Sequence, residues 1–232
     1  MTPRLASQIL PVHELMHAMR LACPSLPVGA YAYSQGLEYA VEAGWVTDRQ
    51  TAGDWISGLL KNTLGGFDLP LLSRLYRSWS EQNLERTEAY ERWVLAGRES
   101  LELRTEELNL GAALLRLLVD LGMLSERHLE GARERGYLSA FALAAVCYGL
   151  SEQVTLTSYC FAWLEHQTSA VTRLIPLGQT DGQRVLSTCL ELTPAVIASS
   201  LEVPDEEIGA LAPGQAIASA LHETQYTRLF RS

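Results

Sequence analysis

Apolar residues recur at helical spacing along most of the chain. Near the start, Val12, Leu15, Met16 and Met19 follow the i, i+3, i+4, i+7 pattern of one helical face. The segment 138–150 is apolar nearly all round, which is typical of a central buried helix. No alternating β-branched run is bounded by turn residues. We therefore predict an all-α protein, in which residues 1–232 form a single compact helical domain of about nine to eleven helices.

Glycine, proline and capping residues predict where helices begin and end. We expect Gly65-Gly66 to end a helix, and Asp68 to cap the next one with its side chain. Pro194 suits the first turn of a helix, so we expect a separate helix to start there. The charged stretch Glu99 to Glu107 is expected to be a solvated helix face.

A loop-rich insert follows a variable N-terminal helix, which we place within residues 1–25. Pro27 and Gly29 favour a turning backbone, and Ser34 is expected to open a short helix that stops at Gly44. The insert is apolar, rich in Tyr and poor in charge, so it must be buried against its own domain or against a partner. For its tyrosines, Tyr33 among them, core and interface both stay open.

Residues 222–232 are predicted to form a C-terminal tail. Tyr226, Leu229 and Phe230 are apolar, and Arg228 and Arg231 flank them. A free tail would gain nothing by exposing these side chains to water. Either the tail docks on its own domain, or it orders on a partner that buries the aromatic rings and pairs the two arginines.

Composition narrows the classes of partner. The chain is 47% hydrophobic and 19% charged, so it can bury a large core. A net charge of −9 argues against binding to nucleic acid or to an anionic membrane. Four cysteines lack C-x-x-C spacing and are expected to be buried thiols. We find no signal-peptide pattern and no apolar run long enough for a membrane span, so we expect a cytoplasmic protein.

One motif resembles a catalytic site. His13-Glu-Leu-Met-His17 fits H-E-x-x-H, in which two histidines on one helical face bind zinc and the glutamate acts as general base. The extended form of the motif fails, because Arg20 and Cys23 occupy the positions of its glycine and third histidine. Three interpretations stay open: an ordinary amphipathic helix, a transition-metal site made by His13 and His17, and a zinc metalloprotease. No other catalytic constellation or phosphate-binding loop is present, so we do not expect an enzyme.

Several separate motifs resemble those of one family. They are Leu26-Pro-Val-Gly29, Tyr33-Ser-Gln-Gly-Leu-Glu38, Asp68-Leu-Pro-Leu-Leu72, Arg98-Glu99, Pro176-Leu-Gly-Gln179, His222-Glu-Thr-Gln-Tyr226 and Arg228-Leu-Phe-Arg-Ser232. In this order and combination they are similar to the urease accessory protein F family. The chain departs from the family pattern at Ala30, Ala32 and Thr227.

The resemblance implies a non-catalytic adaptor in urease maturation. Family members act with urease accessory protein D (also called H) and the GTPase accessory protein G, and this complex inserts nickel into apo-urease while GTP is hydrolysed. The family also implies a homodimer within the complex, nickel delivery by metallochaperone E, and no cofactor bound stably by the chain itself. The other class of function that stays open, besides the metalloprotease, is a helical scaffold of an unrelated complex.

The resemblance also implies which residues contact partners. In the family, the tail becomes ordered on the D-type protein, and the loop before the second helix lies near partner surface. The matching positions are Tyr33, Ser34, Gln35, Glu38, His222, Tyr226, Arg228, Leu229, Phe230 and Arg231.

Overall fold

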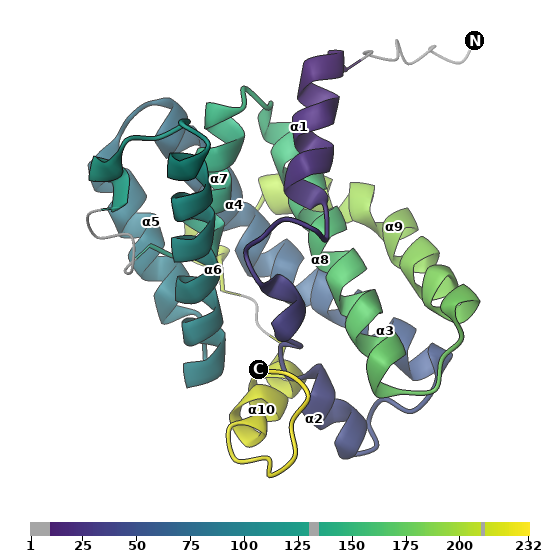
Figure 1. Ribbon diagram of the computed structural model, residues 1–232. Coiled ribbons are helices and arrows are strands. Elements are labelled where there is room, and N and C mark those ends of the chain that lie inside the picture. The colour runs from purple at the N-terminus through teal and green to yellow at the C-terminus, as the bar shows by residue number, and fades with distance from the viewer. Residues whose placement is uncertain (1–9, 130–134, 210–211) are drawn as a thin grey trace, which may run out of the picture.

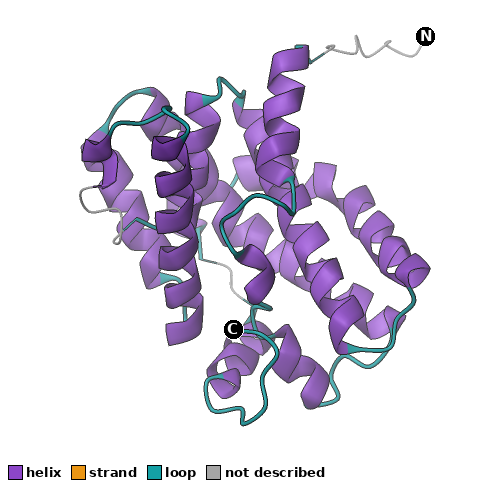
Figure 2. Ribbon diagram, in the orientation of Figure 1, coloured by secondary structure: helices purple, strands orange, loops and turns teal. Residues whose placement is uncertain are grey.

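The computed structural model describes residues 10–129, 135–209 and 212–232. These residues form ten α-helices and contain no strand, so the all-α prediction is confirmed (Figure 1, Figure 2). Residues 1–9 of the expected N-terminal helical segment lie outside the described ranges. Within those ranges, no helix is both long enough and apolar enough to cross a bilayer.

The helices follow one another through short connections. In chain order they are α1 (Val12–Ala22), α2 (Leu37–Glu42), α3 (Arg49–Leu59), α4 (Leu69–Ser80), α5 (Leu84–Ala96), α6 (Leu101–Asp120), α7 (Tyr137–Cys147), α8 (Glu152–Leu174), α9 (Gln179–Leu201) and α10 (Pro213–His222). Shorter elements are the 3-10 turns η1 (Ala30–Ala32), η3 (Glu126–Leu129) and η5 (Asp205–Glu207), and the π-helical segment η2 (Leu60–Asp68).

The core is built around α7 and α8. All residues from Leu138 to Ala145 are buried, as the all-round apolar pattern of this segment predicted. Helix α7 packs chiefly against α4 and α6, whereas α8 packs against α9 and α1 (Figure 1). The helices that pack on α7 and those that pack on α8 therefore contribute to one hydrophobic core.

The expected break at Gly65-Gly66 does not occur. The chain stays helical from α3 through η2 into α4, so that prediction was wrong. Leu64 and Phe67 are buried on the inner side, and a Cβ at Gly65 would lie only 2.9 Å from Val196 of α9. Glycine thus allows two helices to approach, and burial offsets its low helix propensity. Asp68 makes no side-chain cap for α4.

The prediction that a separate helix starts at Pro194 was also wrong, because Pro194 lies inside the continuous helix α9. Proline removes one backbone donor there, but the surrounding turns are held by burial of Cys189, Val196 and Ile197. The Thr193 hydroxyl donates to the carbonyl of Cys189 over 3.0 Å. Tertiary packing therefore overrides the local signal.

Segments from both ends of the sequence meet below the core. Helix α10 packs on α2 and α6, and the tail returns to lie beside the loop that precedes α2 (Figure 1). This meeting point, where both predicted partner-binding segments converge, is the candidate functional site.

Candidate functional site

Loop 26–36 takes its path from three residues with a left-handed backbone. Gly29 has φ 85°, Gln35 has φ 56° and Gly36 has φ 84°. A Cβ at Gly36 would lie 2.9 Å from the backbone nitrogen of Ser219 on α10, so this close approach needs glycine. Gln35 has a side chain, and its left-handed conformation costs roughly 1–2 kcal/mol. The hydrogen bonds that hold it there are described below.

The side chain of Glu38 binds the backbone of the tail. Ser34 does not open the helix as expected, because α2 begins at Leu37 after Gly36, but its hydroxyl accepts a hydrogen bond from the Glu38 backbone N–H over 3.2 Å. The Glu38 carboxylate is buried and accepts the backbone N–H groups of Leu229 (2.6 Å) and Phe230 (2.8 Å). Two charge-assisted bonds to main chain fix the position of the tail whatever its side chains are.

His222 links the tail to α6. Its buried ring lies between two carboxylates, with Nδ1 2.6 Å from Glu102 and Nε2 3.0 Å from Glu38. Carboxylates only accept, so both ring nitrogens donate when the imidazole carries two protons. Arg228 adds a bond of 2.7 Å to the other oxygen of Glu102. We call Glu38, Glu102, His222 and Arg228 the tail cluster.

The last residues of the tail enter the domain. The Arg231 backbone N–H donates to the carbonyl of Ala32 over 2.7 Å, and Ser34 donates its backbone N–H to the carbonyl of Ser232 over 2.8 Å. Phe230 is buried, and the Arg173 guanidinium lies 4.6 Å from its ring centre. Of the two alternatives for the tail, this structure shows docking on its own domain.

The predicted partner-binding residues divide into two groups. Tyr33, Ser34, Glu38, His222 and Phe230 are buried, and Gln35 is half-buried. Tyr226, Arg228, Leu229 and Arg231 are exposed, and Tyr226 is fully so. The buried group forms the frame on which the exposed group is presented.

Three glutamates of α6 were misassigned by the sequence pattern. Glu102 belongs to the tail cluster, and Glu106 and Glu107 are buried rather than solvated, so the prediction of a solvated face was wrong for all three. Their partners lie on other elements, out of reach of any local pattern. A usable signal was present, because Glu106 and Glu107 lie next to the apolar positions Leu103 and Leu110 on the same helix.

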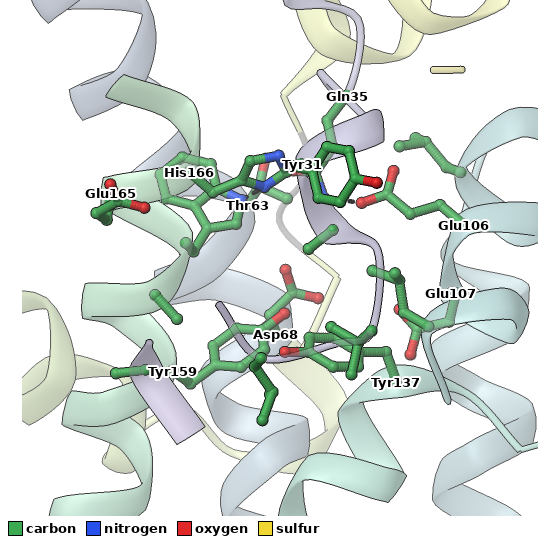
Figure 3. Close-up of a pocket in the computed structure, with 18 of the residues that line it drawn as sticks. Tyr31, Gln35, Thr63, Asp68, Glu106, Glu107, Tyr137, Tyr159, Glu165 and His166 are labelled. Carbon is green, nitrogen blue, oxygen red and sulfur yellow. Dashed lines mark hydrogen bonds between the residues drawn. The ribbon is translucent and has the colours of Figure 1, made fainter. Parts of the chain in front are cut away.

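A cavity of about 140 Å³ adjoins the tail-binding site. Loop 26–36, α6, α7, α8 and η2 line it, and polar side chains point into it from opposite walls (Figure 3). On its floor Arg98 is ion-paired with Asp68 and with Glu107, both over 2.8 Å. Glu107 also accepts the backbone N–H of Leu138 at the start of α7 over 2.8 Å. We call Asp68, Arg98 and Glu107 the core cluster.

Gln35 connects the cavity to its surroundings. Its side-chain carbonyl accepts from the Trp163 indole N–H (2.8 Å), and its amide donates to Glu106 (2.7 Å). Burial raises the pKa of Glu106 to about 7, although hydrogen bonds from Gln35 and Ser232 act to lower it. Across the cavity, burial lowers the pKa of His166 to about 4, so this ring is neutral at physiological pH.

The H-E-x-x-H motif has a structural use. Glu14 is buried and accepts both the backbone N–H and the hydroxyl of Ser151, so it satisfies the N-terminus of α8. The His17 ring stacks on Tyr148 with centres 4.4 Å apart, and His13 lies edge-on to His17 at the same separation. Glu14 is therefore engaged elsewhere and is not poised as a general base. Metal binding by His13 and His17 stays a prediction.

Comparison with known proteins gives a consistent result. Residues 46–190 match the family model described as UreF. The urease accessory protein UreF of Teredinibacter turnerae is 44% identical over 220 residues, which cover 95% of this chain and 99% of that protein. Proteins of the same name from Chromohalobacter salexigens and Alkalilimnicola ehrlichii are 41% and 42% identical, each over 92% of this chain and 93% of the relative.

Proposed function

This chain belongs to the UreF family of urease accessory proteins, which are not enzymes, and from that premise we propose that it is an adaptor in urease maturation. With accessory proteins D (H) and G it forms a complex that inserts nickel into apo-urease as GTP is hydrolysed. Metallochaperone E supplies the nickel, and the complex, rather than a stable site on this chain, handles it. This work takes place in the cytoplasm and involves neither nucleic acid nor membrane.

The exposed side chains of the docked tail carry this proposal. Tyr226 is fully exposed and Leu229 is 57% exposed, while the neighbouring backbone is held by Glu38. Apolar side chains presented on a fixed backbone lose little conformational freedom when a partner covers them. This feature supports a partner surface at the tail, beside exposed Arg228 and Arg231, whose guanidinium groups suit carboxylates.

The outer face of α1 supports the homodimer. Val12, Leu15, Met16 and Met19, which share one helical face, are between 46% and 76% exposed. The buried side of α1 is instead formed by Glu14, Ala18 and Leu21. An apolar stripe in water is typical of a surface that another chain covers.

Urease activation in cells tests the role of the tail. This chain replaces the resident F-type gene in a complete urease operon, and urease activity is measured for the wild type and for Leu229→Ser. We expect the wild type to activate urease and Leu229→Ser to lose most of that activation at unchanged abundance. The matched control is Leu84→Ser on α5, since Leu84 is 56% exposed. Equal activity of the two variants would contradict a partner surface at the tail.

The same assay decides the role of the histidine pair. His13→Ala/His17→Ala with full urease activation would show that the pair is dispensable. Lost activation at unchanged abundance and fold would assign α1 to the metal path or to an interface.

A further inference from the structure

One carboxyl group belongs both to the tail-binding site and to the cavity. Glu106 is buried on α6, and each of its oxygens accepts one hydrogen bond. Oε1 accepts from the Gln35 amide over 2.7 Å, and Oε2 accepts from the Ser232 hydroxyl over 2.9 Å. Docking of the tail therefore supplies one of the two donors to this carboxylate.

Gln35 is not free to replace the donor from the tail. Its side-chain carbonyl is bound by the Trp163 indole N–H, and this bond directs the amide group toward Oε1 of Glu106. The left-handed backbone of Gln35 and the following Gly36 fix the position from which the side chain starts. When Ser232 leaves, Oε2 loses this donor, and the other residues that line the cavity still surround Glu106. A buried carboxylate in that state is strongly destabilised relative to the protonated acid.

We propose that Glu106 couples tail docking to the loss of a proton in the cavity: the carboxyl is ionised while Ser232 donates to it, and it takes up one proton from water when the tail leaves. The pKa of Glu106 supports this coupling, because burial has already raised it to about 7 with the tail docked. The Ser232 bond favours the ionised form, so the docked pKa lies below the undocked one. Docking is thus favoured at higher pH, and it weakens as pH falls from the undocked pKa toward the docked value of about 7.

Other charged and titratable groups also line the cavity with Glu106. From the loop before α6, Arg98 stays cationic and is paired with Asp68 and Glu107. Tyr137 on α7 has a pKa raised by burial and stays neutral. His166 on α8, with a pKa of about 4, also stays neutral across the cavity from Glu106, and the exposed Tyr31 lines the same cavity (Figure 3).

His222 also contacts the tail-binding site. Its ring donates to both Glu38 and Glu102 when it carries two protons. The contribution of Glu106 is therefore measured as a difference between two proteins that both keep His222.

Direct titration of Glu106 tests the coupling. The carboxyl ¹³C resonance of Glu106 is followed from pH 5.5 to 8.5 in the full chain and assigned by its absence in Glu106→Gln. We expect a midpoint near 7 in the wild type and a higher midpoint in Ser232→Ala. The control is Ser200→Ala, which removes another fully buried hydroxyl, one bonded to a backbone carbonyl within α9, and leaves the midpoint unchanged. Equal midpoints in the wild type and Ser232→Ala would overturn the proposal.

A second measurement follows the tail itself. The amide signals of Leu229 and Phe230, bonded to Glu38, report docking in the wild type and in Glu106→Gln. Between the docked midpoint near 7 and the higher undocked one, wild-type docking should fall by up to tenfold per unit decrease in pH relative to Glu106→Gln, the slope for uptake of one proton. Parallel pH profiles would overturn the coupling. If Glu106→Gln releases the tail at every pH, the carbon titration alone decides.

Discussion

The core cluster and the tail cluster each use one carboxylate of α6, Glu107 and Glu102, yet they hold different kinds of structure. In the core cluster, Arg98 lies between Asp68 and Glu107 and joins helices that all belong to the domain core. In the tail cluster, Glu38 accepts the backbone of a terminal segment, and the chain of charges ends at the exposed Arg228. The side chains of the core cluster are buried, whereas the tail cluster reaches solvent at Arg228.

Their cations make the same distinction. Arginine stays charged at any physiological pH, so the cation of the core cluster is permanent. The tail cluster instead includes His222, an imidazole that must hold two protons to donate to both Glu102 and Glu38. This comparison teaches that burial alone does not identify a permanent part of the fold. What matters is whether the partners can leave or change charge.

The largest effect is expected from breaking the core cluster. Arg98→Met leaves Asp68 and Glu107 buried without their cation, which costs about 3–5 kcal/mol in the free energy of unfolding. Urea denaturation measures this loss. Arg86→Met, which removes an exposed pair with Glu81, serves as control and should cost less than about 1 kcal/mol. Similar losses in both variants would show that the core cluster contributes no more to the free energy of unfolding than an exposed ion pair does.

A smaller and local effect is expected from Glu38→Gln. The amide keeps one acceptor but places an NH₂ group among donors, so at least one tail N–H is left unpaired, at about 1–3 kcal/mol. Hydrogen exchange at Leu229 and Phe230 should accelerate. The amide of Leu138, bonded to Glu107 in the core cluster, is the internal reference and should keep its protection. Faster exchange at Leu138 as well would mean that the clusters unfold together.

The smallest effect is expected from Arg228→Met. Its pair with Glu102 is 2.7 Å long, but the Arg228 side chain is 41% exposed, so its loss should weaken docking by less than about 1 kcal/mol. Exchange at Leu229 measures the change, and added salt should reduce the difference from the wild type. An effect as large as that of Glu38→Gln would place Arg228 in the frame of the tail rather than at its edge.

The sequence predicted what local patterns control. Helical periodicity gave the fold class and the buried α7, and the apolar tail indicated a segment that must be covered. It could not reveal that Glu102 meets His222, 120 positions away, or that Ser34 meets Ser232. A glutamate buried by a distant partner has the same local pattern as a solvated one. The cavity was missed for the same reason, since elements from α1 to α10, far apart in sequence, line it.

Errors at Gly65 and Pro194 had a related cause. Both residues are poor helix formers, and in isolation each would interrupt a helix. Within the core, however, Gly65 allows α9 to approach, and the turns around Pro194 bury Cys189 and Ile197. At both positions, tertiary packing outweighs the low helix propensity of the residue.

The π-helical segment η2 changes the phase of an otherwise continuous rod. Its hydrogen bonds close over five residues instead of four, so the apolar stripe of α3 is rotated before it continues along α4. The same rod can therefore lay α3 against α9 and α4 against α7, two helices on different sides of the core. Removing one residue from Leu60–Asp68 would restore a regular helix and turn Asp68 away from Arg98. The register of the whole rod is thus set by one wide turn.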